Sequence, residues 1–250
     1  MESKSPKHEI SLRMMIPSII TVLAFCSGLT SIRFALEGRW EGAVLSIFAA
    51  MILDGMDGRV ARLLQATSRF GALLDSLSDL VCFGFAPAFL IYCFAVGKYI
   101  KFGWSGVMFY STCMALRLAR FNASLDEQKE QPAWLKSYFI GVPAPAGAML
   151  LVTPVCLYLA TDMMMFASFW LNVAVLWCVG LLLVSRIPTL CLKNIHISQN
   201  LISVYAIFFV LFVVVFYTHI WIGLASLNLL YLCSIPLTYI QSKYQASSST

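Results

Sequence analysis

The chain has 250 residues, of which 60 % are hydrophobic and only 12 % are charged. A soluble globular domain carries roughly 25 % charged residues, so this composition excludes an ordinary soluble fold and indicates an integral membrane protein. The net charge of +5 comes without a basic, aromatic-interleaved surface, and we expect no nucleic-acid partner. The eight cysteines are scattered without a C-x-x-C pair, which excludes a zinc site or a disulfide framework. We expect one membrane domain over residues 1–250.

Apolar stretches of about 20 residues predict an all-α, polytopic membrane bundle of about eight transmembrane helices. They lie at residues 16–36, 40–63, 70–96, 102–122, 142–159, 166–185, 201–218 and 221–240. Pro87 predicts a kink or an end within the third stretch. Pro143 is compatible with an ordinary helix start and with irregular backbone beside a cavity.

The positive charges predict the orientation of this bundle. An even number of helices places both termini on one side, and 13 of the 17 Lys and Arg residues fall on that side. Because cytoplasmic loops carry an excess of Lys and Arg, we expect both termini to be cytoplasmic.

Four carboxylates within 26 residues interrupt the apolar pattern. Asp54 and Asp57 are spaced i, i+3, and Asp75 and Asp79 are spaced i, i+4, so on helices each pair projects from one face. One Asp near a bilayer centre costs roughly 2.5–3.5 kcal/mol, and four cost on the order of 10 kcal/mol before their mutual repulsion. A typical domain has about that much stability in total, so something must neutralise the four charges.

Two divalent cations would neutralise four carboxylates, and all-oxygen ligands favour Mg²⁺ or Mn²⁺ over zinc or copper. The small residues Gly58 and Ala61 share the face of Asp54, and Gly71 shares the face of Asp75. Without bulky side chains there, a phosphate-bearing ligand could approach the backbone closely.

The arginines nearby leave an alternative open. Arg62 adds a fixed positive charge at the end of the same stripe, which suits a phosphate ligand. Arg59, Arg62 and Arg69 could instead pair with the aspartates in a structural ion network. That network would account for the arginines but not for the glycines.

The helix lengths indicate how deep in the membrane the carboxylates lie. Asp54 follows Trp40 by 14 residues, about 21 Å of helix, and so lies in the cytoplasmic half of its span. Asp75 lies six residues past the short loop 64–69, at a comparable depth on the next helix. We expect the four carboxylates to meet just below the cytoplasmic interface.

These residues carry a resemblance to a known family. The run from Asp54 reads D-x2-D-G-x2-A-R-x8-G-x3-D-x3-D, which resembles the motif of the CDP-alcohol phosphatidyltransferases. The resemblance implies two metal ions held by four residues: Asp54, Asp57, Asp75 and Asp79. It implies that Asp79 is also the general base. It further implies a CDP-diacylglycerol donor gripped by the residues between: Gly58, Ala61, Arg62, Ser68 and Gly71.

Later segments resemble the serine-using branch of this family. They are R-L-A-R-F-N at 117–122, G-V-P-A-P-A-G from Gly141 and S-R-I-P-T at 185–189. The implied reaction joins CDP-diacylglycerol and L-serine to give phosphatidylserine and CMP, and the resemblance also implies a homodimer. From the charge distribution we expect the site to face the cytoplasm, in the plasma or inner membrane if the source is bacterial. Arg120, Asn122 and Lys193 are the candidate contacts to serine or phosphate, although membrane-end arginines also commonly snorkel to lipid. Ser18 departs from the Asn that family members often carry there.

Two other functions remain open from sequence. Transfer to glycerol 3-phosphate or inositol would use the same chemistry with another acceptor. An ion-coupled transporter could use the carboxylates as a cation site, but the chain shows no obvious internal repeat.

Overall fold

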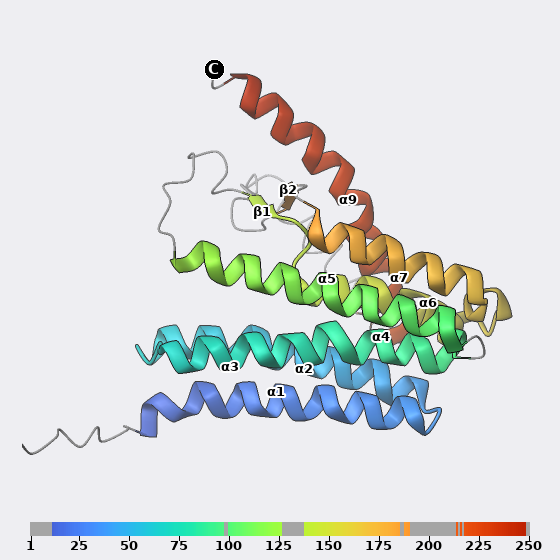
Figure 1. The fold of residues 1–250 in the computed structure, drawn as a ribbon, viewed down its shortest axis with the longest axis horizontal. Helices are drawn as coiled ribbons and strands as arrows, with labels where there is room; N and C mark the ends of the chain where they lie inside the picture. Colours follow the sequence, from blue (N-terminus) through green and yellow to red (C-terminus); the bar gives the residue numbers. More distant parts are fainter. Residues whose placement is uncertain are drawn as a thin grey trace, which may run out of the picture.

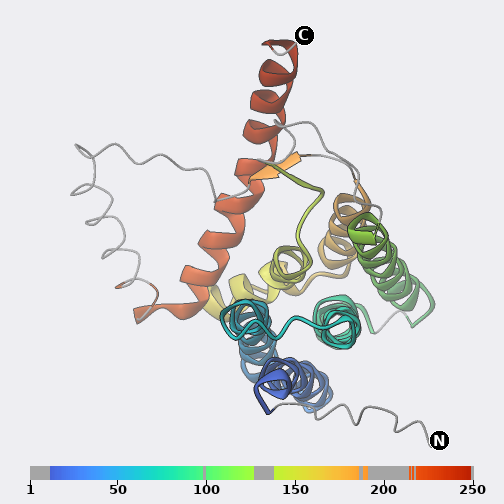
Figure 2. The ribbon, with the colours of Figure 1, turned by 90° about the vertical axis from the view of Figure 1, so that its left-hand side faces the viewer.

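The computed structural model describes residues 12–97, 100–126, 138–185, 188–190, 214, 216 and 218–248. Long helices run side by side in a bundle, and the last helix crosses the others obliquely and extends beyond them (Figures 1 and 2). The order of helices is α1 (Leu12–Leu36), α2 (Trp40–Leu63), α3 (Arg69–Asp79), π-helical η1 (Leu80–Phe85), α4 (Ala86–Ile91), π-helical η2 (Tyr92–Val96), α5 (Ile100–Asp126), α6 (Ala144–Thr161), 3₁₀-helical η4 (Met164–Ala167), α7 (Phe169–Val184) and α9 (Ile220–Ser248).

Within the described residues, three helical stretches are long and apolar enough to cross a membrane: Met15–Leu36, Arg69–Val96 and Ala144–Thr161. Two shorter apolar helices are Phe169–Val184 and Ile220–Pro236. On α1 the apolar side chains of Ile19 and Leu23 are about half exposed, as lipid-facing residues are. The chain is therefore an integral membrane protein with a helical bundle. The predicted helix at 201–218 lies largely outside the described residues.

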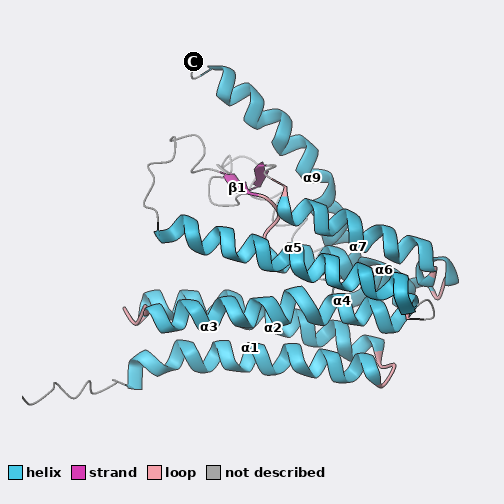
Figure 3. Ribbon diagram, viewed as in Figure 1, coloured by secondary structure: helices cyan, strands magenta, loops and turns pink. Residues whose placement is uncertain are grey.

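The predicted helical bundle is confirmed, and a small two-stranded ribbon accompanies it (Figure 3). β1 (Tyr138–Ile140) pairs antiparallel with β2 (Pro188–Leu190). The strands directly precede α6 and follow α7, two helices that pack against each other. Three-residue strands are too short to show an alternating pattern, so the sequence indicated plain connections here. Gly141, at φ +81°, turns the chain from β1 towards α6.

Pro87 does not end the third helical stretch, contrary to one sequence-based expectation. The backbone passes into π-helical geometry over η1 and continues through α4. Proline has no N–H to offer the carbonyl four residues earlier, which is that of Phe83. The fully buried Tyr110 hydroxyl donates a 3.0 Å hydrogen bond to this carbonyl, and the Ser111 hydroxyl donates a 3.0 Å bond to that of Gly84. α5 thus supplies the donors that make the irregular stretch stable inside the bundle.

A close contact seats α1 against this irregular stretch. A Cβ on Gly28 would lie 2.5 Å from the Cys82 sulfur, so only glycine allows this approach of α1. The Cys82 thiol donates to the Ala24 carbonyl at 3.3 Å. α1 also packs along α2, so it touches both helices that carry the aspartates.

Replacing Tyr110 by Phe should destabilise the fold by about 1–3 kcal/mol, because the Phe83 carbonyl would stay buried without a donor. Thermal unfolding in detergent measures the change. Tyr92→Phe is the matched control, since the Tyr92 hydroxyl makes no hydrogen bond to the described part of the chain. Equal stability of the two variants would contradict this role of Tyr110.

Candidate metal centre

The turn between α2 and α3 brings the aspartates together. The Ala66 amide donates to the Ala61 carbonyl at 2.9 Å and the Gln65 amide donates to that of Arg62 at 3.2 Å, which is a Schellman ending of α2. Gln65 takes the left-handed position at φ +52°. Ser68 then caps α3 by accepting a 3.0 Å hydrogen bond from the Gly71 amide. This tight reversal sets α2 and α3 antiparallel.

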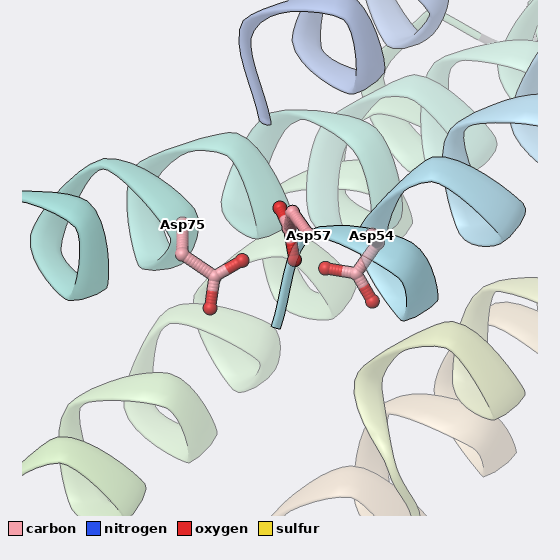
Figure 4. Close-up of side chains that lie close together, drawn as sticks. All are labelled: Asp54, Asp57 and Asp75. Atoms are coloured by element: carbon pink, nitrogen blue, oxygen red, sulfur yellow. The ribbon is translucent and has the colours of Figure 1, made fainter. Parts of the chain in front are cut away.

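Three carboxylates face one another as a result (Figure 4). One oxygen of each of Asp54, Asp57 and Asp75 lies within 4.8 Å of the others. Asp79, one turn further along α3, adjoins Asp54 and lies in the electrostatic field of Arg117. The structure therefore gathers Asp54, Asp57 and Asp75 in one cluster and places Asp79 at its edge.

No arginine neutralises this cluster among the described residues. The ion pairs in that part of the chain join Glu37 to Arg33 and Arg39, at the far end of α1 and α2. The buried Oδ1 of Asp75 has no hydrogen-bond partner there. The geometry does not support the alternative of a structural ion network. An unpartnered buried oxygen within a set of oxygen ligands fits a divalent cation such as Mg²⁺ or Mn²⁺.

A cavity of about 500 Å³ opens beside the cluster. Its wall contains two of the clustered carboxylates, Asp57 and Asp75. It also contains all five residues proposed to grip the donor: Gly58, Ala61, Arg62, Ser68 and Gly71. A Cβ on Gly58 would meet nothing within 4 Å, so this part of the wall is open. Ser18, the departure from the family pattern, also lines the cavity.

Of the three residues proposed to contact the acceptor, two make hydrogen bonds to other helices. Arg120 donates to the Val184 carbonyl at 2.9 Å, which ties α5 to the end of α7. Asn122 exchanges hydrogen bonds with Ser76, the neighbour of Asp75, at 3.0 and 3.3 Å. Lys193 lies outside the described residues.

Sequence reasoning missed Thr21 of α1. Its hydroxyl donates a 2.6 Å hydrogen bond to Asp57 Oδ2, and its side chain lines the cavity. Nothing in the spacing from Pro17 distinguishes Thr21 from a threonine whose hydroxyl bonds its own helix backbone, and the Pro17 carbonyl does lie 3.1 Å from this hydroxyl as a competing acceptor.

Comparison with known proteins places these features in a family. The sequence profile described as CDP-alcohol phosphatidyltransferase matches residues 14–184, which include the whole aspartate motif. A Mycobacterium leprae protein named CDP-diacylglycerol–serine O-phosphatidyltransferase is 41 % identical over 239 residues, covering 93 % of this chain and 77 % of the relative. The Mycobacterium bovis protein of that name is 40 % identical, covering 93 % and 80 %. A Bacillus subtilis protein of that name is 42 % identical over 137 residues, covering 55 % and 73 %.

Gly58→Ala should stabilise the folded protein by about 0.5–1 kcal/mol, because alanine favours a helix and the new methyl group meets no atom. Gly28→Ala should do the opposite, since its methyl group would collide with Cys82. Thermal unfolding of both variants in detergent tests the contrast. Loss of stability in Gly58→Ala would mean that the cavity wall is not open.

Proposed function

The chain belongs to the CDP-alcohol phosphatidyltransferase family, and we propose that it transfers the phosphatidyl group of CDP-diacylglycerol to L-serine, giving phosphatidylserine and CMP. The observation that carries this proposal is the aspartate cluster beside a cavity, in a chain that matches serine-using relatives over 93 % of its length. The enzyme is thus a membrane-embedded transferase of phospholipid synthesis.

Asp54, Asp57, Asp75 and Asp79 would hold the divalent metal, and we propose two Mg²⁺ or Mn²⁺ ions. Bound there, the cations would neutralise the carboxylates and the charge that develops on the phosphate oxygens. The chain's own contribution is to hold three of the carboxylates within 4.8 Å of one another. Such preorganisation reduces the cost of assembling the site during the reaction.

The cavity suits the nucleotide head of the donor. A volume of about 500 Å³ falls within the range of small-molecule sites. Gly58, Ala61 and Gly71 leave the backbone accessible, while Arg62 brings positive charge to the pyrophosphate. The N-terminus of α3, which Ser68 caps, adds the favourable end of a helix dipole. The acyl chains of the donor would remain in the lipid beside the bundle.

Asp79 would act as the general base. It would take the proton from the serine hydroxyl as that oxygen attacks the phosphorus that bears diacylglycerol. The bond from phosphorus to the CMP oxygen then breaks, and CMP leaves. Asp79 suits this role because it stands at the edge of the cluster, next to Asp54. Arg120, Asn122 and Lys193 would contact the acceptor.

The orientation follows from the charge distribution. With both termini cytoplasmic, the site would face the cytoplasm, where serine and the CMP product are soluble. In Figure 1 the α2–α3 turn lies at the end of the bundle where α1 begins, which agrees with this orientation. We further propose a homodimer, as the family resemblance implies.

Purified protein with CDP-diacylglycerol, Mn²⁺ or Mg²⁺ and a panel of alcohols tests the activity directly. We expect CMP release with L-serine, loss of release with a chelator, and little release with glycerol 3-phosphate or inositol. CMP release that prefers one of the other alcohols would overturn the choice of acceptor. Absence of CMP release with every alcohol, from folded protein, would overturn the transferase.

Asp79→Asn should lower kcat by about 100-fold or more, the contribution typical of a positioned general base. Binding of CDP-diacylglycerol should survive, because the amide keeps the shape of the side chain and the other three carboxylates remain. Single-turnover assays and binding of a CDP-diacylglycerol analogue separate the two effects. Wild-type turnover in the folded variant would exclude Asp79 as the base.

A further inference from the structure

Helix α1 carries none of the four aspartates, yet it reaches into the metal centre through Thr21. The Thr21 hydroxyl lies 2.6 Å from Asp57 Oδ2, and both residues are buried, with 4 % and 6 % exposure. This is the length of a charge-assisted O–H···O⁻ bond. The Pro17 carbonyl, at 3.1 Å, competes for the same single proton. The carboxylate is nearer and charged, so it receives the proton.

The backbone of Thr21 makes a second link, to the other aspartate helix. Its carbonyl accepts a 3.4 Å hydrogen bond from the hydroxyl of Ser78, which is 3 % exposed. Ser78 lies between Asp75 and Asp79 on α3. One residue of α1 therefore contacts both α2 and α3 at the level of the carboxylates.

The hydrogen bond from Thr21 to Asp57 can orient the carboxylate, because the two side chains differ in rotational freedom. A carboxylate rotates broadly about its last torsion, so packing alone does not define its plane. Threonine is branched at Cβ and has few rotamers in a helix, which gives its hydroxyl a defined position. A bond from that hydroxyl to one oxygen of Asp57 fixes the plane in which the other oxygen is offered to a cation.

We propose that Thr21 is a positioning residue of the metal centre, which orients Asp57 through its hydroxyl and ties α3 to the same point through its carbonyl. The inference rests on the proposed metal-dependent transfer. It extends the site to a helix outside the aspartate motif. It also assigns the α1–α2 contact a role in metal affinity as well as in packing.

Thr21→Val removes the hydroxyl and keeps the branched shape, whereas Thr21→Ser keeps the hydroxyl. Titration of Mn²⁺ into detergent-solubilised protein, followed by the electron paramagnetic resonance of free Mn²⁺, measures binding without turnover. We expect Thr21→Val to bind Mn²⁺ about ten-fold more weakly, and Thr21→Ser to stay within about two-fold of the wild type. In the assay, Thr21→Val should need correspondingly more Mn²⁺ for half-maximal rate.

Thr30→Val is the matched control. Thr30 lies on the same helix and bonds its own backbone at Cys26, but it is exposed and far from the aspartates. Its Mn²⁺ affinity should equal that of the wild type. If Thr21→Val does not fold, as judged by its thermal unfolding without metal, Thr21→Ala replaces it in the same comparison.

These measurements distinguish failure of the Thr21 role from failure of the proposed metal-dependent transfer. Unchanged Mn²⁺ affinity in folded Thr21→Val, or equal weakening in Thr21→Ser and Thr21→Val, would overturn the positioning role of Thr21 alone. Failure of the wild type to bind Mn²⁺ would overturn the proposed function itself.

Discussion

Carboxylates that lie among apolar helices constrain this fold most strongly: Asp57 is buried, and Asp54, Asp75 and Asp79 are half-buried. In α2, helix packing determines where the carboxylates point. Its fully buried residues Ala43, Ile47 and Ala50 form a stripe at helical spacing, and the same stripe continues into Asp54 and Asp57. Core packing at one end of α2 therefore fixes the rotation of the helix, and with it the direction of the carboxylates at the other end. The proposed cation would then bind at a place that this packing has already determined.

The second helix that carries aspartates, α3, is held through the π-helical stretch that follows it. α3 continues into a π-helical stretch that Tyr110 and Ser111 of α5 satisfy by hydrogen bonds. α1 approaches this stretch closely at Gly28. Irregular helical geometry often occurs at functional sites, and here it immediately follows Asp79. Three helices thus hold the aspartate cluster, although the aspartates themselves, the proposed ligands, come from two.

Periodicity and spacing predicted much of this from sequence. The helix at 40–63 is confirmed as α2 (Trp40–Leu63), and the gathering of Asp54, Asp57 and Asp75 follows from i, i+3 spacing across a short turn. What sequence could not give depends on contacts between distant segments. The bond of Thr21 to Asp57 joins residues 36 apart, and the pairing of β1 with β2 joins connections on either side of two helices. Continuation of the helix past Pro87 likewise depends on a tyrosine of another helix.

Divalent cations that neutralise the aspartate cluster should stabilise the folded protein. The most direct test is the thermal unfolding of metal-stripped protein in detergent as the concentration of free Mn²⁺ rises. Binding to the folded state alone should stabilise it by about 2.7 kcal/mol at 100 times the dissociation constant, with a matching rise in Tm. We expect this rise in the wild type and its loss in Asp75→Asn. A Tm that does not change with Mn²⁺, or that rises equally in Asp75→Asn, would contradict neutralisation of the cluster by divalent cations.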